Sequence, residues 1–115
     1  MAQDPQGAIR AYALLVEGTA MDEACAELIH ARPCLGVSKF YVDPEWHGAG
    51  LATRLLDACV ASGGATGVRS LWLATNVANR RARAFYAKNG FLERGHRVFT
   101  VGGVRNDDVV LELPI

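Results

Sequence analysis

The sequence predicts an α/β domain built on a sheet of mixed strand direction. Turn residues divide the chain into short elements that alternate between strand-like and helix-like patterns. Two of the expected strands lead into helices, and the last two expected strands read as a hairpin. The 115 residues are enough for one hydrophobic core, so we expect a single domain over residues 1–115.

The first expected elements are two strands with a short helix between them. Residues 8–18 ("AIRAYALLVEG") read as a strand that ends at a glycine. In residues 21–30 ("MDEACAELIH") the apolar positions have helical spacing behind Asp22, which favours a short helix with this aspartate as its N-cap. Residues 34–42 ("CLGVSKFYV") form the next strand, which stops at Asp43-Pro44 because proline cannot extend a β-ladder.

A long helix and a buried strand are expected next. The helix starts near Gly50, carries its apolar residues on one stripe and runs out at Gly63-Gly64. Residues 68–75 ("VRSLWLAT") have a continuous apolar centre, which is typical of a strand covered on both faces.

The last part of the chain predicts a second helix and a hairpin. Asn79 is expected to cap the helix, which closes at Asn89-Gly90, where glycine supplies the left-handed turn. Residues 96–101 ("HRVFTV") and 108–113 ("DVVLEL") read as antiparallel strands, with "GGVRND" as the loop between them.

Composition and charge narrow the classes of partner. Twelve basic and twelve acidic residues give a formal net charge of zero, so we expect no nucleic acid or anionic membrane held by charge alone. No apolar run is long enough for a membrane span, and the first ten residues lack the pattern of a secretory signal. The three cysteines have no CxxC spacing, so we expect buried thiols, no metal site and a cytoplasmic location.

The segment "HGAGLA", residues 47–52, predicts a binding site for an anion. It leads from a strand into a helix, so the unpaired N–H groups of the first helical turn and roughly half a positive charge from the helix dipole would point out of it. A strand-to-helix turn without a ligand is the alternative. A P-loop is excluded because no lysine follows Gly50, and a dinucleotide fingerprint is excluded because Thr53 holds the third glycine position.

Two motifs resemble the GNAT family of N-acetyltransferases. "HGAGLA" resembles the family's (Q/R)xxGx(G/A) loop, and residues 79–91 ("NRRARAFYAKNGF") resemble its second motif, NxxAxxFYxxxGF. Both stand at strand-to-helix junctions in the family's order. The resemblance covers about residues 8–115 and implies the acyl-coenzyme A N-acyltransferase fold. Strings such as "FYVDPEW" are similar to a bacterial branch that includes polyamine acetyltransferases.

The resemblance implies that acetyl-coenzyme A is the co-substrate and a small-molecule amine the acceptor. The pantetheine arm would bind where the strands of residues 34–42 and 68–75 splay apart. His47 departs from the family's glutamine or arginine, which puts cofactor affinity and its pH dependence in question. The cofactor-binding residues that the resemblance implies are Phe40, Tyr41, Val42, His47, Gly48, Ala49, Gly50, Leu51, Ala52, Thr53 and Asn79.

Tyr86 is the residue that the resemblance implies for catalysis. A phenol near the sulfur of coenzyme A could protonate the departing thiolate as a general acid. The alternative is a tyrosine that packs beside Phe85 in the core. The strand before the phosphate loop offers Ser38 and Lys39 and no carboxylate, so the general base is unassigned, with Glu27 and His30 as candidates because they precede that strand.

The start of the chain differs from the family pattern. The family fold normally opens with a strand and two helices that wall the acceptor site, whereas residues 8–18 look like its second strand. The expectation is therefore a shortened N-acetyltransferase, or alternatively a non-catalytic module that binds acyl-coenzyme A. Because "YALLV" is apolar, we expect a second copy to cover it, in a homodimer with Ala11 to Val16 near the contact.

Overall fold

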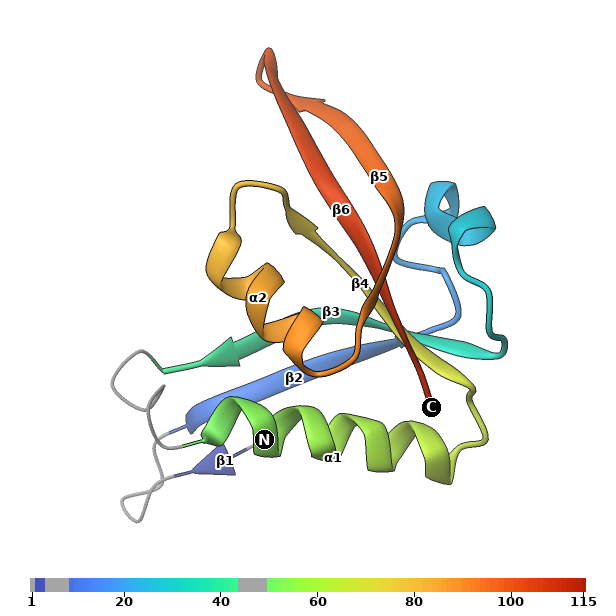
Figure 1. The fold of residues 1–115 in the computed structure, drawn as a ribbon, viewed down its shortest axis with the longest axis vertical. Helices are drawn as coiled ribbons and strands as arrows, with labels where there is room; N and C mark the ends of the chain where they lie inside the picture. Colours follow the sequence, from blue (N-terminus) through green and yellow to red (C-terminus); the bar gives the residue numbers. More distant parts are fainter. Residues whose placement is uncertain (1, 4–8, 44–49) are drawn as a thin grey trace.

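The computed structural model describes residues 2–3, 9–43 and 50–115, and it shows a twisted mixed sheet flanked by helices (Figure 1). Over the described residues the sheet has six strands in the order β1-β2-β3-β4-β6-β5, which confirms the predicted α/β class. The elements in chain order are β1 (Ala2–Gln3), β2 (Ile9–Glu17), the 3-10 helix η1 (Glu23–Leu28), β3 (Cys34–Val42), α1 (Leu51–Ala65), β4 (Ser70–Asn76), α2 (Arg80–Lys88), β5 (Leu92–Val101) and β6 (Val104–Pro114).

The parallel contact between β3 and β4 is short. It comprises three residue pairs, Cys34–Ser70, Leu35–Leu71 and Gly36–Trp72, although the strands have nine and seven residues. All other neighbouring strands pair antiparallel. Residues 37–42 of β3 and 73–76 of β4 therefore lie beyond the ladder that joins the two strands, which is the splayed arrangement expected from the sequence.

The helices divide between the two faces of the sheet. Both α-helices pack on one face, where Leu56 and Cys59 of α1 and Tyr86 of α2 share a core with the strands. The 3-10 helix η1 packs on the other face, where Cys25 contacts the cluster around Trp72. The three cysteines are buried free thiols, as predicted. Within the described residues no helix is both long and apolar enough to cross a membrane.

Strand β2 is better covered than the sequence indicated. Its partner on the outer edge is β1, which pairs with it at Ile9 and Ala11. Ala11 is fully buried against Leu51 and Leu55 of α1, so one face of "YALLV" is already packed. Leu14 is 49% exposed, and the apolar residues that remain uncovered are on the other face.

Asp22 begins η1 and ties it to the hairpin. One oxygen of its carboxylate accepts a hydrogen bond from the Ala24 amide at 2.9 Å, which confirms the predicted N-cap. Its other oxygen accepts from Arg97 at 2.7 Å, and the same guanidinium donates to Asp108 at 2.7 Å. This contact fixes η1 on its face of the sheet.

Helix α1 continues past the point where the sequence suggested an end. The predicted stop at Gly63-Gly64 lies inside the helix, which runs to Ala65. Gly63 is buried, and a Cβ atom there would come within 2.9 Å of Val68 and 3.1 Å of Ile115. The glycine therefore allows close packing and does not terminate the helix.

The hairpin between β5 and β6 is longer and tighter than expected. The predicted six-residue loop is wrong: the turn consists of Gly102 and Gly103, with φ angles of 57° and 78°, and residues 104–107 belong to β6. Two glycines in the left-handed region are typical of a two-residue turn that matches the twist of the strands. The hairpin reaches away from β2 at the top of Figure 1.

A buried carboxylate that the sequence did not single out anchors the segment before β3. Glu112 has 0% exposed surface and accepts hydrogen bonds from the amides of His30 at 3.0 Å and Ala31 at 2.9 Å. Arg94 donates to it from β5 at 2.8 Å. Burial alone would raise the pKa of the Glu112 carboxyl, but these hydrogen bonds outweigh burial and hold the pKa below its ordinary value.

We expect Glu112 to make folding sensitive to acid. A lowered folded-state pKa stabilises the protein above the ordinary value of 4.5, and this contribution is lost as the pH falls through the folded-state value. Glu112→Gln should lower the free energy of unfolding at pH 7 by about 3 kcal/mol and flatten its pH dependence in acid. Urea unfolding from pH 3 to 7 measures both, with the exposed Glu17→Gln as control. Identical acid dependence in Glu112→Gln and the unmodified protein would contradict the assignment.

Candidate active site

A cavity opens where β3 has left the ladder with β4. It has a volume of about 300 Å³ and lies between the end of β3, the first turn of α1 and the inner face of α2. Eight side chains from these three segments line it: Phe40, Val42, Ala52, Asn79, Arg81, Ala82, Phe85 and Tyr86.

Five of the residues predicted for the site meet in this cavity. Phe40 and Val42 contribute from β3, Ala52 from α1, and Asn79 and Tyr86 from the cap and body of α2. They come from segments far apart in the sequence. The structure thus brings described residues of both motifs to one cavity, with Ala52 from the first motif and Asn79 and Tyr86 from the second.

Three other predicted residues lie close to the cavity without lining it. The Tyr41 side chain is on the opposite face of β3, where its ring lies 5.4 Å from that of Tyr12. Leu51 is buried in the core below α1, and Thr53 is exposed. A cofactor would meet these residues through their backbone groups, which is how the sequence argument used them.

The glycine-rich loop is described only at its end. His47, Gly48 and Ala49 lie outside the described residues, so their roles remain predictions. Gly50 is the N-cap of α1 with φ 71° and ψ 12°, and a Cβ atom at this position would have no described atom within 4 Å. The first turn of α1 contains no acidic residue and receives no side-chain cap from Gly50. This helix end is therefore electrostatically suited to an anion.

Asn79 has a structural role that is compatible with binding. Its side-chain oxygen accepts a hydrogen bond from the Ala82 amide at 3.3 Å, which confirms the predicted N-cap of α2. The cap employs the oxygen, so the side-chain NH₂ group is the donor that Asn79 can offer to a ligand in the cavity it lines.

Tyr86 is both a core residue and a lining residue of the cavity. It is 8% exposed and packs among aromatic rings, with centroids 5.1 Å from Phe91, 5.4 Å from Phe85 and 6.1 Å from Phe40. It also lines the cavity. Burial, with a smaller effect of Cys59, raises the pKa of Tyr86 to about 12. The phenol is therefore in its acid form over the whole neutral range.

Arg81 lines the cavity although it is not among the site residues predicted from the sequence. It is the charged residue among the eight that line the cavity. Its spacing of four from Phe85 is the signal that could have placed both on one side of α2.

The structure does not bring the two candidate bases to the cavity. Glu27 belongs to η1 and His30 follows it, and η1 packs on the opposite face of the sheet. No carboxylate or histidine is among the described residues that line the cavity.

Comparison with known proteins identifies relatives in sequence. The profile of the Acetyltransferase (GNAT) family matches residues 3–91. Proteins named "uncharacterized N-acetyltransferase" from Mycobacterium tuberculosis and Mycobacterium bovis are 36% identical to the chain over 105 residues. The match covers 91% of this chain and 60% of each relative, so the chain spans about three fifths of their length.

Solved structures show the same fold at low sequence identity. The ribosomal-protein-S18-alanine N-acetyltransferase of Escherichia coli has a TM-score of 0.71 and 24% identity, over 99% of this chain and 65% of that one. A spermidine N-acetyltransferase chimera of the Vibrio cholerae and human enzymes has a TM-score of 0.73 and 22% identity, over 98% and 66%. The two motifs, the splayed strands and the family match agree, and the chain belongs to the Acetyltransferase (GNAT) family.

Proposed function

We propose that the chain binds acetyl-coenzyme A in the gap between β3 and β4 and transfers the acetyl group to a primary amine of a small molecule. The observation that carries the proposal is the short parallel ladder. After three residue pairs the two strands separate, and the cavity beside residues 37–42 is lined by residues of both family motifs.

The described residues fit the parts of this co-substrate. Pantetheine carries amide groups, and backbone N–H and C=O groups beyond the β3–β4 ladder could bind them as an added strand would. The phosphates would lie at the N-terminus of α1, on the amides of Gly50, Leu51, Ala52 and Thr53 together with those of residues 47–49. Asn79 would donate to the pantetheine arm, and Arg81 supplies positive charge to the same cavity.

Tyr86 is proposed as the general acid. Acetyl-coenzyme A supplies an acetyl thioester that a neutral amine can attack, and the reaction releases a thiolate. The Tyr86 hydroxyl would donate its proton to that sulfur, and the proton that the acetylated nitrogen gives up would restore the phenol; its raised pKa keeps Tyr86 protonated at neutral pH before the reaction. A polyamine-like acceptor is the first to test, because residues 40–46 resemble a bacterial branch that includes polyamine acetyltransferases.

A non-catalytic acyl-coenzyme A binding module is the second candidate. It is favoured by one observation, the lack of a carboxylate or histidine among the described residues that line the cavity. A screen of amines for thiol release from acetyl-coenzyme A separates the candidates. Release that depends on an amine supports the enzyme, whereas binding without release under any amine supports the module.

Acetyl-coenzyme A should raise the melting temperature of the protein, and NAD and ATP should do so much less. A ligand at 100 times its dissociation constant stabilises the folded state by about 2.7 kcal/mol, which is readily seen by scanning fluorimetry. NAD and ATP carry phosphates but no pantetheine arm for the gap between the strands. Equal shifts with all three ligands would reduce the assignment to a general phosphate site.

A homodimer is proposed for the uncovered side of β2. The side facing α1 is packed, which leaves the opposite side with Leu14 and the stacked pair Tyr12–Tyr41 as the apolar surface nearest to the predicted contact. A two-fold contact there would let one patch serve both copies. Sedimentation across a wide concentration range is expected to show dissociation with a parallel fall in turnover. A monomer with undiminished specific activity would refute the dimer.

The free thiols suit a cytoplasmic location, which we also propose.

A further inference from the structure

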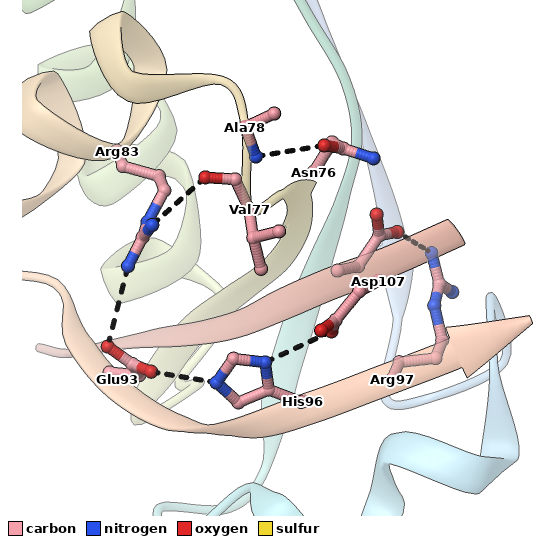
Figure 2. Close-up of polar contacts among 9 residues, drawn as sticks. Asn76, Val77, Ala78, Arg83, Glu93, His96, Arg97 and Asp107 are labelled. Carbon is pink, nitrogen blue, oxygen red and sulfur yellow. Dashed lines mark hydrogen bonds and ion pairs between the residues drawn. The ribbon is translucent and has the colours of Figure 1, made fainter. Parts of the chain in front are cut away.

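Four side chains link α2 to the hairpin and close a ring through the segment before α2 (Figure 2). Arg83 donates to the carbonyl of Val77 at 2.9 Å and pairs with Glu93 at 3.9 Å. The ring nitrogens of His96 lie 3.1 Å from Glu93 on one side and 3.1 Å from Asp107 on the other. The amide of Val77 donates to the backbone carbonyl of Asp107 at 3.0 Å, which completes the ring. We call Arg83, Glu93, His96 and Asp107 the Arg83 network.

The segment held by this network leads into the candidate site. Residues 77–79 connect β4 to α2, and Asn79 both caps α2 and lines the cavity. Asn76 shapes the connection further, since its side chain accepts from Ala78 at 2.9 Å and its carbonyl accepts from Asn79 at 2.9 Å. A shift of Val77 would therefore move Asn79 and the first turn of α2.

We infer that Arg83 is a positioning residue for acetyl-coenzyme A binding, and that protonated His96 keeps it in place through Glu93. This inference rests on the proposed function. Arg83 acts through Val77 and Asn79, and it is on the side of α2 that faces β5 and not among the residues that line the cavity. No sequence motif described above contains this network as a whole.

The protonation state of His96 decides whether the network can close. An imidazolium has two N–H donors, one for Glu93 and one for Asp107, whereas a neutral imidazole has one donor and leaves a lone pair facing a carboxylate. The charged groups around His96 are Glu93 from β5, Asp107 from β6, and, behind Glu93, Arg83 from α2. Arg97 is next to it in sequence but bonds Asp22 and Asp108, as described for η1.

The direction of the pH effect follows from these contacts. The hydrogen bond to Asp107 is the main influence and raises the pKa of His96 above 6.5; burial, the next largest influence, opposes this rise, and the hydrogen bond to Glu93 adds to it. The protonated ring is thus favoured in the folded protein. The stabilisation of the network by protonated His96 is complete below pH 6.5 and is lost as the pH rises through the folded-state pKa of His96.

The test compares acetyl-coenzyme A affinity from pH 5.5 to 9 in four proteins by titration calorimetry. In the unmodified protein the dissociation constant should rise by roughly two- to fivefold through the His96 titration, the range of exposed ion pairs. His96→Gln should remove that step. Arg83→Gln should weaken binding by a similar factor at low pH and also remove the step. Arg80→Gln, which removes the same charge from α2 outside the network, should keep the step and bind within about twofold of the unmodified protein.

His47 is a second titratable histidine, which the sequence assigns to the predicted phosphate loop, so the series is repeated in a His47→Gln background. The inference is overturned if the pH step in affinity persists in His96→Gln, or if Arg80→Gln binds acetyl-coenzyme A as weakly as Arg83→Gln does. In either case, binding of acetyl-coenzyme A still supports the proposed function. If acetyl-coenzyme A binds at no pH, the proposed function fails. Hydrogen exchange at the Val77 amide then tests the network. The exchange rate should be higher in Arg83→Gln than in Arg80→Gln, and equal rates would refute a role of Arg83 in holding Val77.

Discussion

Replacement of Gly50 by valine is expected to abolish detectable binding of acetyl-coenzyme A. Gly50 has a φ of 71°, and a β-branched residue pays about 1–2 kcal/mol to adopt the left-handed region. The isopropyl group would also occupy the space above the first turn of α1 where we place the diphosphate. Loss of two hydrogen bonds to a charged group, at about 1.5–3 kcal/mol each, weakens binding by roughly 10²- to 10⁴-fold. Titration calorimetry measures the loss.

Two further variants separate backbone strain from lost contacts. Gly67 also has a positive φ, 81°, with open space around it, and it lies at the other end of α1. Gly67→Val should lose similar stability and keep its affinity for acetyl-coenzyme A. Gly50→Asn tolerates the left-handed backbone yet adds a side chain, so it should fold well and bind poorly. Tight binding by a folded Gly50→Val protein would move the phosphate site away from this turn.

Replacement of Tyr86 by phenylalanine is expected to lower kcat by about 10²-fold with little change in the affinity for acetyl-coenzyme A, because removal of a positioned proton donor has this scale. Phenylalanine keeps the ring that packs against Phe85 and Phe91, so folding should be preserved. Thiol release under saturating amine measures kcat, and melting temperature reports the fold.

Thr100→Val is the control, because it removes a hydroxyl from an exposed residue of β5 that does not line the cavity. Its kcat should stay within about twofold of the unmodified protein. Burial raises the pKa of Tyr86 to about 12, so the loss of its proton should not lower the activity at pH values well below 12. An unchanged kcat in Tyr86→Phe would leave Tyr86 as a core residue only.

The elements that were predicted well from the sequence begin or end at capping and turn residues next to them in the chain. Asp43-Pro44 ends a strand at Val42, and the predicted strand over residues 34–42 agrees with β3. Asn79 starts α2 at the next residue, through a hydrogen bond to an amide three residues away. Local capping and turn chemistry can be recognised without knowledge of the fold.

The features that the sequence missed depend on distant partners. Glu112 is in an apolar strand and looks like a solvent-facing position, yet it is buried because amides 81 and 82 residues earlier in the chain donate to it. Gly63 resembles a helix stop, and only the approach of Val68 and Ile115 explains why a glycine is needed inside α1. The sequence predicted Gly102-Gly103 and the four residues after them as one loop, but residues 104–107 lie in β6, where Asp107 binds His96.

The candidate site also divides into residues that could be predicted from the sequence and residues that depend on the fold. The family resemblance predicted Phe40, Val42, Ala52, Asn79 and Tyr86 as site residues, and these five line one cavity because a family pattern encodes positions in a shared fold. Arg81 was not assigned to it, since the residue type alone does not tell which side of α2 it occupies. The Arg83 network joins three elements, and no single stretch of sequence contains it.

The short ladder between β3 and β4 also makes the sheet a pair of half-sheets. On one side are β1, β2 and β3, on the other β4, β6 and β5, and three residue pairs form the backbone seam between them. A ligand that binds the separated strands as an added strand would lengthen this seam. The hydrogen bonds that hold such a substrate would then also hold the two halves together. If acetyl-coenzyme A binds there as proposed, it would stabilise the closed seam, and by linkage a mutation that opens the seam should weaken its binding.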